Sequence, residues 1–291
     1  MISDSRQKPR QRSKTHQPRV DSVRLNLYEV AMYKAILWDI DGTLLNFLKS
    51  ENAAIKECFR KLGLGECTDE MIVVYSGIND SYWRMLERGE IEKPVLFLRR
   101  FEDFFGKYGI MCYPAEFNLL YQQMLGLHIF FNDDSYQLVK SLKERGIHQY
   151  AVTNGSFTAQ DRKLRKSGLD QLLDGIFISD VVGAEKPSVE YFDRVFAQIP
   201  EGREEVIIVG DSLTSDIRGA NNAGIACCWY DPAGTPPPEG LRIDHIISDL
   251  NQITGQQEYD NTMDTWMNLS LQKERGMGLK SLIAEKSHSN Y

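Results

Sequence analysis

Short apolar runs alternate with amphipathic stretches along most of the chain. The amphipathic stretches have helical spacing; between residues 133 and 146, for example, Leu138 and Leu142 share one face and Gly146 marks the end. The apolar runs have the length of buried strands, and each ends in polar residues: 33–40, 148–155, 174–180, 205–211, 224–230 and, more briefly, 244–248. Strands alternating with helices predict an α/β fold with a doubly wound parallel sheet.

The alternation is interrupted once, after the first apolar run. Residues 47–131 contain no strand-like run and only helical spacing. One apolar stripe in this block has the spacing i, i+3, i+4 and i+7, at Ile55, Cys58, Phe59 and Leu62. We therefore expect residues 47–131 to form an all-helical subdomain inserted into a Rossmann-like core of residues 32–46 and 132–254.

The two ends of the chain differ from this core. Residues 1–31 carry seven Lys or Arg against three acidic residues, a net of +4 that leaves −11 on the other 260 residues. This segment lacks the apolar stretch of a secretory signal. Its Arg and Ser content is also compatible with an organelle transit peptide, but we expect a disordered tail. Residues 255–291 are polar, and we interpret them as a C-terminal extension.

Composition narrows the class of protein. A hydrophobic content of 42% and a charged content of 26% are typical of a globular protein in water. The net charge of −7 argues against a nucleic-acid polymer as partner, but not against a small phosphate ester. The five cysteines form no CxxC pair, and no apolar run reaches the roughly 18 residues of a membrane span. We expect a cytoplasmic protein with no membrane contact.

Polar residues of chemical interest follow the predicted strands. Carboxyl ends of parallel strands lie along one edge of a sheet, so residues distant in sequence can meet there. A lysine joins them just before Pro187, at the expected start of a helix over residues 188–198. The candidates are Asp39, Asp41, Thr153, Asn154, Lys186 and Asp211.

Three of these candidates are carboxylates that could share a site. Asp39 and Asp41 are two residues apart, so in extended backbone they face the same side, and Asp211 would add a third charge. Converging carboxylates need a hard cation such as Mg²⁺, which also reduces the repulsion between a carboxylate nucleophile and a phosphate. The remaining candidates are suitable donors to phosphoryl oxygens: Thr153, Asn154 and Lys186.

This arrangement suggests a two-step phosphoryl transfer. Asp39 would attack phosphorus and form an aspartyl-phosphate, while Asp41 would protonate the leaving oxygen and later activate water. Each motif also has a simpler interpretation. The aspartates could form a solvated turn, Thr153 could cap a helix, and Lys186 could lie on the surface.

Four motifs resemble those of the haloacid dehalogenase-like superfamily, and they occur in the same order: "DIDGT" (39–43), "TNG" (153–155), "KP" (186–187) and "GDSLTSD" (210–216). The helical insert after the first motif resembles the first class of cap domain in that superfamily. The resemblance covers about residues 32–254. It implies the Rossmann-like fold and a Mg²⁺-dependent reaction.

The resemblance also implies residue roles. Asp39 is then the nucleophile and a metal ligand, and Asp41 is the acid/base that gives the metal its backbone carbonyl. Asp211 is the other metal ligand, and Asp216 supports the metal or Lys186 from a second position. The residues that bind the phosphoryl group are Thr153, Asn154 and Lys186. Asp41 indicates phosphoryl transfer, because dehalogenases similar to this chain lack that carboxylate.

Within the superfamily, "YKAILWDIDGTLLNF", "GDSLTSDIRGANNAGI" and "CWYDP" resemble the pyrimidine 5′-nucleotidase branch. Asn46 departs from that pattern, because many members have an aspartate there, and this loosens the substrate assignment. In the cap we expect residues 75–89 to set specificity, with Asn79 and Asp80 starting a helix. Several cap aromatics could stack on a base, although such residues are usually core: Phe47, Tyr75, Trp83, Phe97 and Tyr108.

Three functions remain open from the sequence. The first is a Mg²⁺-dependent nucleoside 5′-monophosphatase. The second is a sugar-phosphate or phosphoglycolate phosphatase, or a phosphomutase, with the same motifs. The third is a non-catalytic protein that binds a phosphorylated ligand. The sequence gives no expectation of the oligomeric state.

Overall fold

The computed structural model describes residues 33–254, so the expected tail over 1–31 and the extension over 255–291 lie outside the described residues. Six strands form one sheet in the order β3-β2-β1-β4-β5-β6, and every neighbouring pair is parallel. The strands are β1 (Ala35–Trp38), β2 (His148–Thr153), β3 (Gly175–Ile178), β4 (Val206–Gly210), β5 (Ala226–Tyr230) and β6 (His245–Ile247). The doubly wound α/β fold and all six predicted strands are confirmed.

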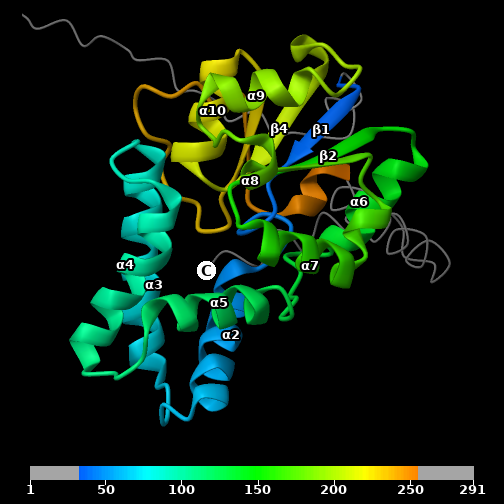
Figure 1. Ribbon diagram of the computed structural model, residues 1–291. Helices are drawn as coiled ribbons and strands as arrows, with labels where there is room; N and C mark the ends of the chain where they lie inside the picture. The colour runs from blue at the N-terminus through cyan, green and yellow to red at the C-terminus, as the bar shows by residue number, and fades with distance from the viewer. Residues whose placement is uncertain (1–32, 255–291) are drawn as a thin grey trace, which may run out of the picture.

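Helices cover both faces of this sheet (Figure 1). Side chains of β1 alternate between the faces: Ile36 and Trp38 face one side, and Ala35 and Leu37 face the other. The first face packs against α6 and α7, and the second against α9 and α10. The core helices are α6 (Ser135–Glu144), α7 (Phe157–Ser167), α8 (Ser179–Val182), α9 (Val189–Phe196), α10 (Arg218–Ala223) and the π-helical turn η3 (Leu213–Ile217).

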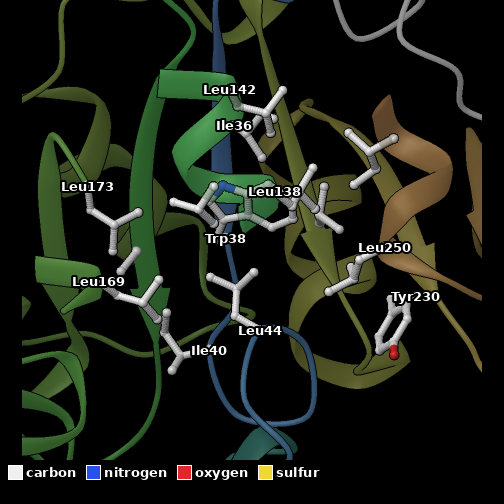
Figure 2. Close-up of a cluster of buried hydrophobic side chains, with 14 of the residues drawn as sticks. Ile36, Trp38, Ile40, Leu44, Leu138, Leu142, Leu169, Leu173, Tyr230 and Leu250 are labelled. Atoms are coloured by element: carbon white, nitrogen blue, oxygen red, sulfur yellow. The ribbon is translucent and has the colours of Figure 1, made fainter. Parts of the chain in front are cut away.

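Trp38 lies in the middle of the first hydrophobic cluster, among the labelled Ile36, Leu138 and Leu44 (Figure 2). Its side chain is fully buried. The indole Nε1 donates a 3.0 Å hydrogen bond to Gln149 Oε1, and Gln149 Nε2 donates at 2.8 Å to a backbone carbonyl of α6. The polar atoms in this core are therefore paired, which removes the penalty of burying them.

Four helices form a separate hydrophobic unit, the cap, which lies beyond the end of β1 (Figure 1). Aromatic rings dominate its interior; Phe101 lies 4.8 Å from Phe117 and 5.2 Å from Tyr75 between ring centroids. Burying such rings is the main stabilising contribution to a unit this small. The helices are α2 (Phe47–Leu62), α3 (Asp69–Glu87), α4 (Lys93–Tyr108) and α5 (Pro114–Leu125).

One predicted helix start in the cap is wrong. Helix α3 begins at Asp69, where the Thr68 side chain accepts a hydrogen bond from the Met71 amide at 3.3 Å. Asn79 and Asp80 therefore lie in the middle of the helix. Asn79 is buried there because its amide pairs with other cap helices, a tertiary contact that outweighs its preference for helix starts.

The chain enters and leaves the cap through two adjacent segments. Asn46 caps α2, since its Oδ1 accepts from the Lys49 amide at 3.0 Å, and its Nδ2 donates to Asn132 Oδ1 at 2.9 Å. Asn132 Nδ2 in turn donates to the carbonyls of Gly42 and Thr43, each at 3.0 Å. This asparagine pair joins the two segments that enter and leave the cap to the loop that follows β1.

The described residues contain neither a membrane span nor a disulfide. None of the helices between residues 33 and 254 is both long and apolar enough to cross a bilayer. All five cysteines are free thiols. Four of them are buried, and burial raises the pKa of the Cys58 thiol to about 12, which keeps it protonated.

Candidate active site

The sequence motifs meet at the carboxyl edge of the sheet. Asp39 follows β1, Thr153 ends β2, and Asp211 follows β4. Strand β1 lies between β2 and β4, so these three positions are adjacent. The order in which strands are added to the sheet changes direction between β1 and β4. Ligands bind at such a point in open α/β folds.

Lys186 joins two buried carboxylates at the centre of this edge. Its Nζ donates to Asp39 Oδ1 at 2.8 Å, to Asp216 Oδ1 at 2.7 Å and to the Val152 carbonyl at 2.8 Å. The lysine is only 2% exposed. Because an ammonium group has three protons, these contacts use all of its donors and fix its position.

Burial controls the ionisation of these groups. It raises the pKa of Asp39 to about 7, against the opposing attraction of Lys186. Burial also raises the pKa of Asp211 and Asp216, and the charge of Asp39 adds to the effect on Asp211. For Lys186, burial alone would lower the pKa, but the charges of Asp216 and Asp39 raise it above its ordinary value.

The carboxylates form a group that suits a divalent metal ion. One oxygen from each of Asp39, Asp211 and Asp216 lies within 4.8 Å of the other two. A single ammonium group cannot neutralise three carboxylates, and repulsion from neighbouring aspartates adds to burial in raising the pKa of Asp39 and Asp211. An all-oxygen donor set fits a hard cation such as Mg²⁺. The carboxylate of Asp41 is not part of this group.

Thr43, to which the sequence analysis assigned no role, links two of these acids. Its hydroxyl accepts from the Asp211 amide at 3.1 Å and lies 3.1 Å from Asp39 Oδ2 and 3.3 Å from Asp211 Oδ1. Gly42 makes this approach possible. A Cβ atom there would lie 2.3 Å from the Asp211 carboxylate, and the residue has a φ of +100°. In the sequence, the "GT" of the first motif was the available indication of these two roles.

Asp41 points toward helix α7 instead of toward Lys186. Gln160 Nε2 donates to Asp41 Oδ2 at 2.6 Å, and the ammonium group of Lys163 pairs with Asp41 Oδ1. Neither of these residues of α7 was among the candidates from the sequence. The only indication in the sequence is that Gln160 and Lys163 follow the "TNG" motif three residues apart, which places both on one face of the helix.

The second motif shapes the loop beside Lys186. The Asn154 side chain donates to the Lys186 carbonyl at 2.8 Å and accepts from the Lys186 amide at 2.9 Å. Thr153 Oγ1 accepts from the Gly155 amide at 3.1 Å. Asn154 therefore holds the lysine loop in place, and Thr153 lies in the wall of the cavity above the acids.

A cavity of about 590 Å³ opens above these residues, which is the size of a small-molecule site. Its floor contains Asp39, Asp211 and Lys186. One face of α3 lines the opposite wall, because the lining positions repeat at helical spacing. They are Ser76, Asn79, Asp80, Trp83 and Glu87, all within the segment 75–89.

Among the five aromatics singled out in the cap, Phe47 and Trp83 line this cavity. Tyr75 is fully buried against Phe101, and Tyr108 packs on Phe104 at 5.5 Å between centroids. The helical spacing of most cap aromatics therefore reflects core packing.

Polar contacts from α3 and α4 hold the cap against the core. The Glu87 carboxylate of α3 accepts from the hydroxyl of Thr214, in the turn that follows Asp211. Lys93, at the start of α4, donates to Ser179 Oγ at 2.7 Å and forms ion pairs with Asp180 at 2.7 Å and Glu185 at 3.0 Å. Glu185 directly precedes Lys186, so this contact lies beside the candidate site.

Comparisons with known proteins agree with this geometry. The family model for haloacid dehalogenase-like hydrolases matches residues 33–224. The chain belongs to this family and is therefore a hydrolase. The HAD-hydrolase YfnB of Bacillus subtilis is 32% identical over 232 residues, which span 79% of this chain and 98% of YfnB. A crystal structure of YfnB with bound magnesium has a TM-score of 0.71 over 76% of this chain and 96% of that chain.

Two further relatives have named substrates. The pyrimidine 5′-nucleotidase PynA of Streptococcus pneumoniae is 33% identical over 201 residues, which span 69% of this chain and 84% of PynA. A glyceraldehyde 3-phosphate phosphatase of Methanopyrus kandleri is 25% identical over 213 residues, which span 67% of this chain and 82% of that enzyme. Both named activities are hydrolyses of phosphoric monoesters, and this chain is consistent with the same class of enzyme.

Proposed function

We propose that the protein is a Mg²⁺-dependent nucleoside 5′-monophosphatase that favours pyrimidine nucleotides and works through an aspartyl-phosphate. The observation that carries this proposal is the cluster of Asp39, Asp211, Asp216 and Lys186 at the floor of a cavity that the cap closes from above. A nucleophilic carboxylate, its counter-ion and acidic metal ligands are the groups that phosphoryl transfer requires.

In the first step, a carboxylate oxygen of Asp39 attacks phosphorus as the bond to the leaving oxygen breaks. Asp41 gives its proton to that oxygen, so the leaving group departs as an alcohol. In the second step, Asp41 takes a proton from water, the water oxygen attacks phosphorus, and the Asp39–phosphorus bond breaks. Inorganic phosphate leaves and both aspartates return to their starting state.

Lys186 and the metal ligands prepare this reaction. Lys186 holds Asp39 and Asp216 with hydrogen bonds that fix the nucleophile in one orientation. Asp39 and Asp211 would hold Mg²⁺, together with the backbone carbonyl of Asp41 and with Asp216 as ligand or support. When bound, the ion supplies positive charge that offsets the repulsion between the carboxylates and a phosphate dianion. Thr153, Asn154 and Lys186 are the proposed phosphoryl-binding groups, with Lys186 acting through its charge because its three donors are already engaged.

The cap wall supports a nucleotide as substrate. The rings of Phe47 and Trp83 line the cavity, and Asp80 adds a hydrogen-bonding group. A base needs both kinds of contact, an apolar face and polar edges. The similarity to PynA favours pyrimidines, and the movement between domains described for YfnB supports a cap that closes over the substrate.

A sugar phosphate or phosphoglycolate is the second candidate substrate class. The polar face of α3 and the similarity to a glyceraldehyde 3-phosphate phosphatase favour it. A phosphomutase or a non-catalytic binding protein would keep the same fold. We propose a cytoplasmic enzyme that acts on a small molecule, with neither a nucleic-acid polymer nor a membrane as partner, because the chain has a net charge of −7 and free thiols.

The test is phosphate release from pyrimidine and purine monophosphates, sugar phosphates and phosphoglycolate, each with Mg²⁺ and with EDTA. We expect Mg²⁺-dependent release that is fastest with pyrimidine monophosphates. Preference for a sugar phosphate would keep the reaction and replace the substrate. No release from any ester under either condition would support the binding-protein alternative.

A further inference from the structure

Helix α7 presents two buried polar side chains to the active site. Gln160 is 1% exposed and Lys163 is fully buried. A lysine is rarely buried completely, because removing its charge from water is costly unless a partner compensates. Lys163 has such a partner in Asp41.

Each oxygen of the Asp41 carboxylate has its own donor from this helix. Gln160 Nε2 donates to Oδ2 at 2.6 Å, and Lys163 Nζ donates to Oδ1. A carboxylate held at both oxygens by one rigid element has a fixed orientation. The Asp41 side chain remains 19% exposed toward the cavity, so a bound ester can still reach it.

Lys163 also lies beneath the first turn of the cap. Its ammonium group is 5.4 Å from the centre of the Phe47 ring, at the start of α2. Phe47 lines the cavity, so Lys163 contacts both the general acid and the wall that faces the substrate. The ring supplies a second favourable contact for the buried charge.

We propose that Gln160 and Lys163 are positioning residues for Asp41, and that they stabilise the negative charge that Asp41 gains when it protonates the leaving group. This inference rests on the proposed acid/base role of Asp41. Charge appears on Asp41 in the first step and disappears from it in the second. Loss of Lys163 should therefore slow departure of a poor leaving group more than hydrolysis of the aspartyl-phosphate.

Two aryl phosphates separate this role from a structural one. Phenyl phosphate has a poor leaving group that needs a proton, and 4-nitrophenyl phosphate has a good one that does not. The ratio of kcat/KM for the two esters reports only the steps up to leaving-group departure, and both esters form the same phospho-enzyme. The ratio is also independent of which natural ester the enzyme prefers.

The experiment measures this ratio, with Mg²⁺, for the wild type, Lys163→Met, Lys163→Arg and Gln160→Met. Lys163→Met is expected to lower kcat/KM for phenyl phosphate at least about tenfold more than for 4-nitrophenyl phosphate, within the usual contribution of general acid catalysis. Gln160→Met should shift the ratio in the same direction, and Lys163→Arg should restore most of it. Arg165→Met is the control, because Arg165 lies on the same helix and pairs with Asp161 on the surface.

Thermal unfolding shows whether each variant folds. If Lys163→Met does not fold, the ratio measured for Gln160→Met tests the inference. Equal losses with both esters, or an unchanged ratio, would overturn the inference. Aryl phosphatase activity without release from nucleotides would reject the nucleotidase assignment and still leave this test intact. A wild type inactive on both aryl esters would overturn the inference together with the proposed reaction.

Discussion

Asp39 and Asp41 lie two residues apart, and each carboxylate has a different lysine as its partner. Asp39 pairs with Lys186 from the loop before α9, and Asp41 pairs with Lys163 from α7. The two carboxylates thereby have separate surroundings: Asp39 is buried beside Asp211 and Asp216, and Asp41 lies at the cavity edge. Separate surroundings allow one aspartate to act as nucleophile and the other as acid and base.

Asp39→Asn separates catalysis from stability. Removing the nucleophile is expected to lower kcat at least about 1000-fold. The same change removes one of three crowded carboxylates, so in EDTA the variant should be at least as stable as the wild type. Phosphate release and thermal unfolding of the same sample measure both effects. A variant that keeps more than a tenth of the wild-type kcat would exclude Asp39 as nucleophile.

Sequence patterns identified some of these residues and missed others, and the difference has a physical reason. The motifs "DIDGT", "TNG" and "GDSLTSD" could be found because each places polar residues at a strand end, and "KP" because it occurs between them in the expected order. The fold brings Asp39, Asp211 and Lys186 together. Lys163 could not be distinguished from Lys166 three positions later, since both lie in a charged helix. Only the packing of α7 against the β1 loop decides which lysine is buried.

At the scale of elements, buried polar contacts connect the cap helices to one another. Glu51 of α2 accepts from Ser76 and, at 2.9 Å, from Asn79 of α3, and Asn79 accepts from Arg100 of α4 at 2.8 Å. Arg100 continues the network to Asn118 of α5 at 2.8 Å. Every helix of the cap contributes a member, so the network specifies how the four helices pack.

Glu51 should make the stability of the protein depend on pH. Burial raises its pKa to about 6 from an ordinary value of 4.5, although hydrogen bonds and the charges of Arg100 and Lys163 oppose the shift. The folded state therefore binds this proton more tightly than the unfolded state. The stabilising contribution is complete below about pH 4.5 and is lost as the pH rises through 6, a difference of about 2 kcal/mol.

Glu51→Gln removes this dependence, because glutamine keeps the shape without the charge. We expect the variant to gain about 1–2 kcal/mol over the wild type near pH 7.5 and nothing near pH 4. Denaturant unfolding between pH 4 and 8 measures the difference. Glu57→Gln, on the exposed side of the same helix, should give no gain at neutral pH because Arg60 lowers the pKa of Glu57. A pH-independent difference for Glu51→Gln would contradict this interpretation.

Lys93 of α4 connects the cap to the core, and its loss should favour the open cap. The side chain is 8% exposed and contacts Ser179, Asp180 and Glu185. Lys93→Met is expected to lower kcat/KM for the natural ester about tenfold, equivalent to about 1.4 kcal/mol. It should also speed hydrogen exchange in α8. Lys107→Met, at the exposed end of the same helix, is the control; equal kcat/KM in the two variants would argue against a role in closure.

The strands were predicted well because a parallel sheet covered on both faces leaves nearly continuous apolar runs in the sequence. The cap was harder. Its helices were recognised as a block, but the start of α3 was misplaced at Asn79, whose partners Glu51 and Arg100 are distant in sequence. The true start at Asp69 does have a local signal, because the Thr68 side chain caps the helix through the Met71 amide.

At the scale of the whole molecule, the excess negative charge at the sheet edge should couple metal binding to stability. A ligand that binds only the folded state stabilises it by about 2.7 kcal/mol at 100 times its Kd. We expect Mg²⁺ to raise the thermal unfolding midpoint and EDTA to reverse the effect. Asp211→Asn should abolish most of the shift, whereas Asp180→Asn, outside the acidic cluster, should keep it. The same midpoint with and without Mg²⁺ would contradict a metal site at these residues.

The asparagine pair at the base of the cap has a consequence for how such enzymes diversify. Asn46 and Asn132 bring the two ends of the insert into direct contact, while the strands on either side keep their own pairing. The insert is thus a module whose two ends adjoin where the chain enters and leaves it. A different module could be exchanged there without rebuilding the β1–β2 pairing, so a new cavity wall can arise while the acidic residues at the sheet edge stay unchanged.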